Sequence, residues 1–230
     1  MVANRDLLQG IFVVIAAYNE AKNIKNVLDR LLVKFPNVVV VDDGSRDGTE
    51  ALVAGTSAFL LRHITNRGQG AALQTGIQFA LLKGADIIVT FDADGQHDER
   101  DIDALVQPIL REECDATFGS RFLGHAHNIP LSRKIILAAG ILFTWVISRV
   151  RVSDVHNGLR AFSRQAASSL HITMDRMAHA SEMLDQIIRS GWRYREIPVN
   201  IYYSRESLAK GQSSWQALKI ASQVLLKKII

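Results

Sequence analysis

Short apolar runs alternate with segments of helical periodicity along the first half of the chain. Five runs are rich in β-forming residues, too short for helices and bounded mostly by turn-forming or charged residues: residues 10–17, 38–42, 59–63, 87–91 and 115–119. Such runs are typical of buried strands in a parallel sheet. The segments between them predict helices, most clearly around residues 24–32, where apolar side chains recur every three or four positions.

This alternation of strand and helix predicts an α/β fold. Parallel strands joined by right-handed crossovers place helices on both faces of the sheet. No repeat or low-complexity linker interrupts the pattern, so we expect one domain over residues 1–212, followed by an amphipathic C-terminal helix over residues 213–230.

The second half of the chain has a different pattern. Residues 135–147 are apolar on nearly every side and have basic residues on both flanks, yet the run is too short to cross a bilayer, which needs about 20 residues. It is consistent with a buried core helix or with a helix lying in a membrane interface. The tail, residues 213–230, has one polar and one apolar face and could dock on the domain, on a partner or on a membrane.

Between these segments, residues 153–160 form a polar turn that leads into Ala161 and Phe162. A helix is expected around residues 181–189. A strand is expected over residues 194–203, and Pro198 places it at an edge of the sheet.

The composition indicates which kinds of ligand the protein is expected to bind. The 230 residues are 48% hydrophobic and carry a net charge of +4, which suits phosphorylated ligands or an anionic membrane surface. Binding to nucleic acid is not expected, because the chain has no long basic run and no aromatic-basic recognition motif. The single Cys114 allows no internal disulfide, and the first ten residues lack the pattern of a signal peptide. We therefore expect a cytoplasmic location.

Two of the predicted strands end in pairs of acids. Asp42 and Asp43 follow one strand, and Asp92 and Asp94 follow another. The carboxyl ends of parallel strands form the rim where open α/β sheets bind ligands. Carboxylates there suit Mg²⁺ or Mn²⁺, although an isolated Asp-x-Asp often only caps a turn or helix. The glycine-rich residues 66–76 match neither a dinucleotide fingerprint nor a P-loop.

Several motifs together resemble the family 2 glycosyltransferases, and within them the polyprenyl-phosphate glycosyltransferases. They occur in the family's order: Ala17-Tyr18-Asn19-Glu20, Asp42-Asp43-Gly44-Ser45-Arg46-Asp47-Gly48-Thr49, Asp92-Ala93-Asp94-Gly95-Gln96-His97, Gly119-Ser120-Arg121 and Gly158-Leu159-Arg160-Ala161-Phe162. The resemblance covers residues 10–205. It implies a GT-A (Rossmann-like) fold and an inverting transfer of sugar from a UDP- or GDP-linked donor to a polyprenyl phosphate.

The resemblance also implies site residues. The residues expected to bind the nucleotide are Ala17, Tyr18, Glu20, Asp42, Gln69, Asp92 and Ala93. Those expected to bind Mg²⁺ or Mn²⁺ are Asp92, Asp94 and Gln96. Those expected to act in catalysis are Asp94, Arg121, Arg133, Arg160 and Lys210. Asp43 and Ser45 are expected to shape their turn, and His97 to lie beside the metal rather than to bind it.

The acceptor decides whether a base is needed. A phosphate monoester with a second pKa of about 6 is already largely ionised at neutral pH, so it needs positive charge around it rather than a base. A saccharide hydroxyl would need a carboxylate base, for which Glu182 and Asp185 are the candidates. The alternatives are therefore transfer to a saccharide in polysaccharide synthesis, or a non-catalytic module that binds nucleotide sugars.

The chain departs from the family pattern in two respects. Gln69 stands where members often carry lysine, which leaves Arg67 as the nearby positive charge. No transmembrane pair follows the catalytic segment. Membrane contact would come from residues 135–147, from the tail or from a small membrane subunit, and we expect a protein peripheral to the inner face of the membrane.

Overall fold

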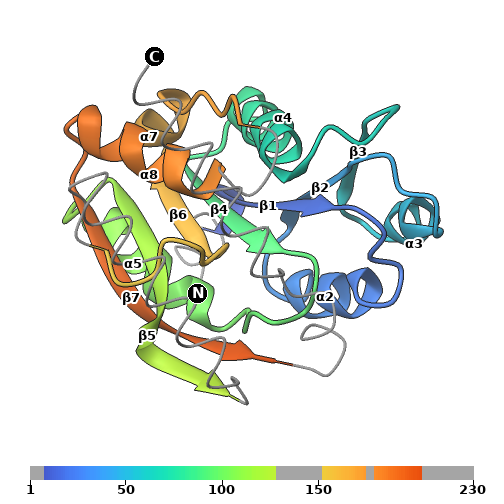
Figure 1. The fold of residues 1–230 in the computed structure, drawn as a ribbon, viewed down its shortest axis with the longest axis horizontal. Coiled ribbons are helices and arrows are strands. Elements are labelled where there is room, and N and C mark those ends of the chain that lie inside the picture. The colour runs from blue at the N-terminus through green and yellow to red at the C-terminus, as the bar shows by residue number, and fades with distance from the viewer. Residues whose placement is uncertain (1–7, 128–151, 175–178, 204–230) are drawn as a thin grey trace, which may run out of the picture.

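The computed structural model describes residues 8–127, 152–174 and 179–203, which form a single seven-stranded sheet covered by helices (Figure 1). The strands are β1 (Ile11–Ala17), β2 (Asn37–Asp42), β3 (Phe59–Arg62), β4 (Ile87–Asp92), β5 (Ala116–His127), β6 (Arg160–Ser163) and β7 (Tyr194–Tyr202). The helices are α2 (Ile24–Leu31), α3 (Thr49–Ala54), α4 (Gln69–Leu82), α5 (Asp101–Leu110), α7 (Arg164–Ser168) and α8 (His179–Arg189).

The sheet is mostly parallel, as the alternating pattern predicts. Its strand order is β3-β2-β1-β4-β6-β5-β7, and β6 alone in this sheet runs antiparallel to its neighbours. β6 separates β4 from β5 and was not predicted as a strand, because its four residues follow directly on a polar turn. The prediction that β7 is an edge strand is confirmed.

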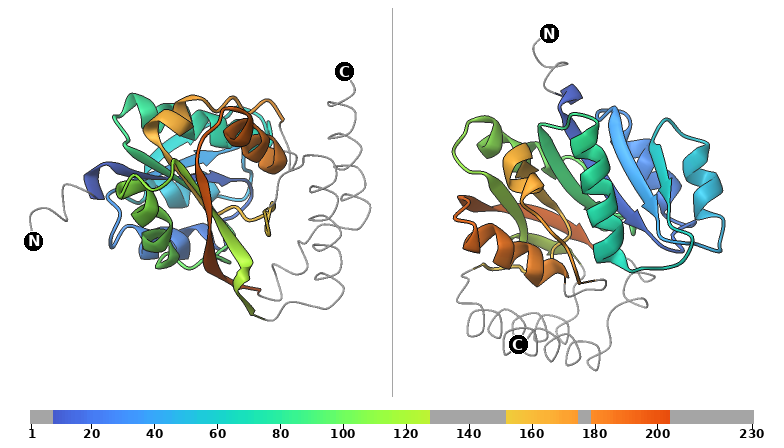
Figure 2. Two further views of the ribbon diagram at one scale, coloured as in Figure 1. Left: turned by 90° about the vertical axis from the view of Figure 1, so that its left-hand side faces the viewer. Right: turned by 90° about the horizontal axis from the view of Figure 1, so that it is seen from above.

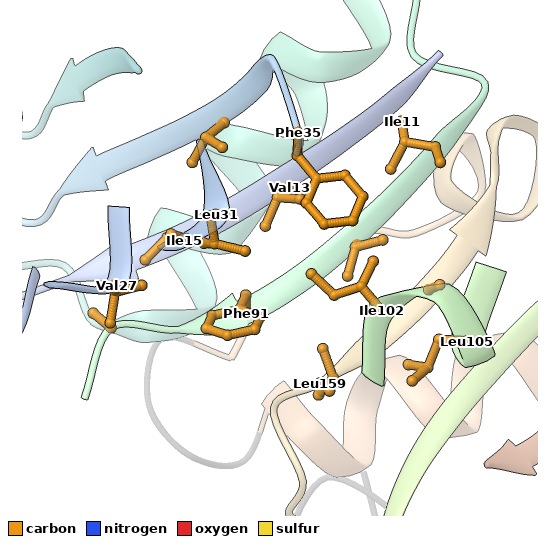
Figure 3. Close-up of a cluster of buried hydrophobic side chains, with 14 of the residues drawn as sticks. Ile11, Val13, Ile15, Val27, Leu31, Phe35, Phe91, Ile102, Leu105 and Leu159 are labelled. Carbon is orange, nitrogen blue, oxygen red and sulfur yellow. The ribbon is translucent and has the colours of Figure 1, made fainter. Parts of the chain in front are cut away.

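Successive side chains along β1 pack on opposite faces of the sheet. Ile11, Val13 and Ile15 of β1 contact the core under α2 and α5 (Figure 3). Phe12 and Val14 contact the core under α4, α7 and α8, which lie together on the other face (Figure 2). Both faces of β1 are therefore buried, which is why its sequence is apolar throughout.

The order of the strands reverses at β1. From β1 the chain moves outward through β2 to β3 and then returns to β4 on the other side of β1. The register aligns the strand ends, with Ala17 opposite Asp42 and Ala16 opposite Asp92. A reversal of strand order of this kind is where open α/β sheets bind their ligands.

Several predictions fall outside the described residues. Arg133, the apolar run 135–147, Lys210 and the tail 213–230 all lie there. Within the described part of the chain, no helix combines the length and apolar character needed to span a membrane.

Candidate active site

The acidic loop, residues 92–97, begins where β4 ends, beside the point at which the strand order reverses. Both oxygens of the Asp92 carboxylate are held by protein groups: Gln69 Nε2 donates to Oδ1 over 3.1 Å, and His97 Nε2 lies 2.9 Å from Oδ2. The ring of His97 is buried and packs edge-on against Phe91. His97 thus lies beside the acidic pair, in contact with one of its carboxylates.

Among the described residues, the hydrogen bonds to Asp94 come from within the same loop. Its oxygens accept hydrogen bonds from the backbone N–H of Gln96 over 3.0 Å and from Gln96 Nε2 over 2.6 Å. Burial and the neighbouring charge of Asp92 raise the pKa of Asp94. Burial alone would also raise the pKa of Asp92, but the hydrogen bond and charge of His97 outweigh it and hold that pKa below its usual value.

The acidic loop is suited to a divalent cation. Two carboxylates lie close enough for one to disfavour ionisation of the other, and a cation between them would remove that repulsion. Among the described residues, no cluster of three or more His, Cys, Asp or Glu side chains could hold a metal. A site here would therefore consist of Asp92, Asp94 and the amide of Gln96, with oxygens of the substrate completing the shell, as is common for Mg²⁺.

The ends of β1 and β2 are joined by hydrogen bonds. Asn19, which has a left-handed backbone with φ 54°, donates its N–H to Ser45 Oγ and accepts from the N–H of Arg46, both over 2.9 Å. The N–H of Glu20 donates to Thr49 Oγ1 over 2.9 Å. Strained conformations of this kind often mark functional loops. The loop also presents the 45%-exposed ring of Tyr18.

Asp42 lies fully buried at the end of β2. Its Oδ1 accepts a long hydrogen bond of 3.3 Å from the N–H of Ser45. Its Oδ2 has no hydrogen-bond partner among the described residues, and the nearest charge recorded for it is Arg62 Nε at 3.8 Å. A buried carboxylate oxygen without a donor is unfavourable, so a hydrogen bond from a ligand N–H or O–H to this atom would be stabilising.

The two described arginines proposed for catalysis are both engaged by the protein. Arg121 is buried, pairs with Asp154 through Nε over 2.6 Å, and donates to the hydroxyl of Tyr203. Arg160 donates to the carbonyls of Val155, Asn157 and Ala180. Burial lowers the pKa of Arg160 to about 10, an effect opposed by the charges of Asp92 and Asp154.

The carboxylates considered as bases also have structural partners. Glu182 accepts hydrogen bonds from the backbone N–H groups of Thr173 and Met174 and from the Thr173 hydroxyl. Asp185 pairs with Arg189 one turn further along α8. Both candidate bases therefore have structural partners within the described part of the chain.

The sequence analysis missed the neighbours that shape this site. Gly158 lies against the carboxylate of Asp92, so closely that a Cβ at position 158 would overlap both oxygens. Thr90 Oγ1 donates to the Gly158 carbonyl over 2.7 Å and fixes this approach. Asp154, the partner of Arg121, lies in the same segment. The available signal was a polar run, residues 153–160, in which several side chains are buried.

Comparison with known proteins gives concordant similarities. Residues 12–170 match the family described as Glycosyl transferase family 2. A UDP-N-acetylglucosamine–dolichyl-phosphate N-acetylglucosaminyltransferase of Methanococcus voltae is 32% identical, covering 95% of this chain and 96% of the relative. An undecaprenyl-phosphate mannosyltransferase of Micrococcus luteus is 29% identical, covering 82% of each chain.

A solved structure shows the same fold. Glucosyl-3-phosphoglycerate synthase from Mycobacterium tuberculosis, crystallised with Mn²⁺, uridine diphosphate and phosphoglyceric acid, superposes with a TM-score of 0.73 over 94% of this chain and 76% of that chain. The sequences are 21% identical. This likeness establishes the GT-A architecture.

Proposed function

The chain belongs to glycosyltransferase family 2, and on that premise we propose that it transfers a sugar, with inversion, from a nucleotide-diphosphate sugar to a polyprenyl phosphate. The observation that carries the proposal is similarity, over 95% and 82% of this chain, to enzymes named for dolichyl-phosphate and undecaprenyl-phosphate acceptors. The two relatives differ in the sugar that their names give. The proposal therefore leaves both UDP-linked and GDP-linked donors as substrates to test.

The nucleoside binds across the ends of β1 and β2. The exposed ring of Tyr18 is a surface on which a base can stack. The buried Oδ2 of Asp42, which has no donor among the described residues, accepts a hydrogen bond from the base or ribose. Ala17, which lies between the Asp42 and Asp92 strands, brings little bulk to the crevice.

The diphosphate lies at the acidic loop. Asp92, Asp94 and Gln96 would hold Mg²⁺ or Mn²⁺ there, and the cation would supply positive charge that stabilises the departing nucleotide. Asp92 keeps a fixed orientation because Gln69 and His97 each hold one of its oxygens. Each carboxylate oxygen has two lone pairs, so these hydrogen bonds leave acceptor capacity for a further ligand.

The acceptor phosphate attacks as an anion, and positive charge allows it to approach. Because Arg121 and Arg160 are held by Asp154 and by backbone carbonyls, we assign them the shaping of residues 152–160 beside Asp92. Direct contacts with the lipid phosphate then fall to Arg133, a candidate for holding phosphate oxygens, and to Lys210, which resembles the family's basic loop that closes on phosphates. A lipid acceptor requires the protein to work at a membrane surface, and we propose the cytoplasmic face.

A product assay tests the proposal. The protein is incubated with Mn²⁺ or Mg²⁺, a short-chain polyprenyl phosphate and one of a panel of UDP- and GDP-sugars, and the lipid is examined by mass spectrometry. We expect a polyprenyl-phosphate sugar from at least one donor, lost on chelation and in Asp94→Ala. Transfer to saccharides alone, or nucleotide binding without any lipid product, would contradict the proposal.

A further inference from the structure

Asp43 is buried beside the site, and both oxygens of its carboxylate have hydrogen-bond partners within the protein. Oδ1 lies 2.7 Å from His63 Nδ1 and accepts the backbone N–H of Arg67 over 2.9 Å. Oδ2 accepts the backbone N–H of Gly68 over 2.7 Å. Only 2% of the residue is exposed. Asp43 therefore fastens the glycine loop, residues 66–70, to the end of β2.

The imidazole of His63 extends this connection to helix α4. Its Nε2 lies 3.0 Å from Thr75 Oγ1, on the second turn of α4. The end of β2, the end of β3 and the start of α4 are thus joined through one carboxylate and one ring. Charge-assisted hydrogen bonds to backbone N–H groups are stronger and shorter than neutral ones, so this is a firm attachment.

Gly68 gives the loop the backbone that the attachment requires. Its φ is 95° and its ψ 159°, a conformation that residues with a Cβ rarely adopt. It is the residue before α4, whose first residue is Gln69. The two N–H groups held by Asp43 therefore immediately precede the side chain that contacts Asp92.

We propose that Asp43 is a positioning residue of the transfer reaction: by fixing residues 67 and 68 it sets Gln69 against Oδ1 of Asp92 and so orients the metal-binding carboxylate. The inference rests on the proposed metal site at the acidic loop. It assigns Gln69 a role different from the lysine that the family often carries. The amide orients Asp92 through a hydrogen bond and leaves its negative charge available to the cation.

A double-mutant cycle on Mn²⁺ binding tests the inference without measuring turnover. The affinity for Mn²⁺ alone is measured by titration, with free Mn²⁺ followed by its paramagnetic resonance, for wild type, Asp43→Asn, Gln69→Ala and the double variant. Because groups that orient metal ligands typically contribute about 10- to 100-fold in metal affinity, we expect each single variant to lose about tenfold. The double variant should lose no more than Gln69→Ala does.

Two further variants separate positioning from stability. Asp115→Asn removes a carboxylate that also accepts a backbone N–H, from Arg193 at the start of β7, and should lower stability without changing Mn²⁺ affinity. Gly68→Ala leaves Asp43 in place but disfavours the loop backbone, so it keeps the test available if Asp43→Asn does not fold. It should weaken Mn²⁺ binding and be equally non-additive with Gln69→Ala.

The outcomes are distinguishable. Additive losses, or unchanged Mn²⁺ affinity in a folded Asp43→Asn or Gly68→Ala protein, would overturn the positioning role and leave the proposed function intact. Failure of the wild-type protein to bind Mn²⁺ would overturn the metal site itself and the inference with it.

Discussion

Gly158 and Asp92 lie in direct contact, with the backbone of the glycine against the carboxylate of the aspartate. The Gly158 carbonyl is held by Thr90 of β4, so the glycine cannot easily move away. The carboxylate is held in turn by Gln69 and His97. A residue outside the acidic motif thus helps to fix the geometry of the proposed metal site.

Gly158→Ala should therefore reduce activity far more than stability. The new Cβ would overlap both carboxylate oxygens, and rotation of the Asp92 side chain relieves the clash without unfolding the protein. Misplacement of a reacting group by about 1 Å can reduce rates on the order of 100-fold, and we expect a loss of that order in sugar transfer.

Gly55→Ala is the matched control, because a Cβ there meets only ordinary contacts of 3.6 Å or more. Thermal midpoints and transfer rates are measured for both variants. Equal activity of Gly158→Ala and Gly55→Ala would contradict the role given to this contact.

Asp94→Asn should lose sugar transfer without losing thermal stability. Burial and the charge of Asp92 raise the pKa of Asp94, so its ionised form is disfavoured in the folded protein without metal. The neutral amide removes that repulsion. We expect a thermal midpoint at least as high as that of wild type in chelator, and a loss of transfer of about 100-fold or more, since electrostatic stabilisation of developing charge is of that size.

The informative comparison adds Mn²⁺ to both proteins. Wild type should gain thermal stability through binding, whereas Asp94→Asn should gain little. A variant that is much less stable than wild type in chelator would show that Asp94 has a structural role instead.

The parallel strands could be predicted because the sequence of each strand alone is enough to identify it. β1, β2 and β4 are apolar on both faces, β2 and β4 end in an acid and polar residues follow β1, so composition and length identify them. β6 was not predictable in this way, because it has four residues and its position depends on pairing with β4 and β5. The strand β5 continues to His127 through pairing with β7, which local sequence does not reveal.

The site residues also divide into those that local sequence identifies and those whose contacts depend on the fold. The acids at the ends of β2 and β4 were identified from their place after buried strands, and the aligned register brings those strand ends together. The partners of Arg121 and Arg160 could not be deduced, because a motif gives the residue and not the direction of its side chain. The contacts of Gly158 and Asp43 depend on segments far apart in the chain.

The buried ion pair between Arg121 and Asp154 should be critical for folding. Asp154 Oδ2 accepts from both the backbone N–H and Nε of Arg121. Removal of one partner of a buried pair leaves an uncompensated charge, so Asp154→Ala should lower the free energy of unfolding by about 3–5 kcal/mol. Asp185→Ala, which removes a more exposed pair with Arg189, should lower it by about 0.5 kcal/mol. Similar urea midpoints for the two variants would contradict this assignment.

Asp115 should contribute to the pH dependence of stability. Hydrogen bonds from Arg193, which joins the starts of β5 and β7, lower the pKa of Asp115 below its usual 3.8. A carboxyl with a lowered pKa in the folded state stabilises above its unfolded pKa, and that contribution is lost as the pH falls through the folded value. Asp115→Asn should thus show a smaller fall in thermal midpoint than wild type between about pH 6 and about pH 2.

Arg193→Met is the companion variant, because it removes the same interaction from the other side. It should flatten the acid limb similarly, and the double variant should add nothing. Parallel acid limbs for wild type and Asp115→Asn would show that this pair does not contribute.

Glu182→Gln should leave transfer to a lipid phosphate nearly unchanged. One oxygen of Glu182 accepts the backbone N–H groups of Thr173 and Met174, and the other accepts the Thr173 hydroxyl over 2.6 Å. Glutamine can keep its carbonyl oxygen toward the backbone and donate to the hydroxyl, so the local structure should survive. A general base contributes about 10²- to 10⁴-fold to a rate, whereas replacement of a carboxylate with a structural role should change the rate by less than about tenfold. A loss of 100-fold or more with this lipid-phosphate acceptor, in a variant with an unchanged thermal midpoint, would show that Glu182 takes part in the reaction and would contradict its structural role, because an ionised phosphate does not need its proton removed. Asp185→Asn, measured beside it, covers the second candidate base on α8, and both variants are assayed with the same donor and polyprenyl phosphate.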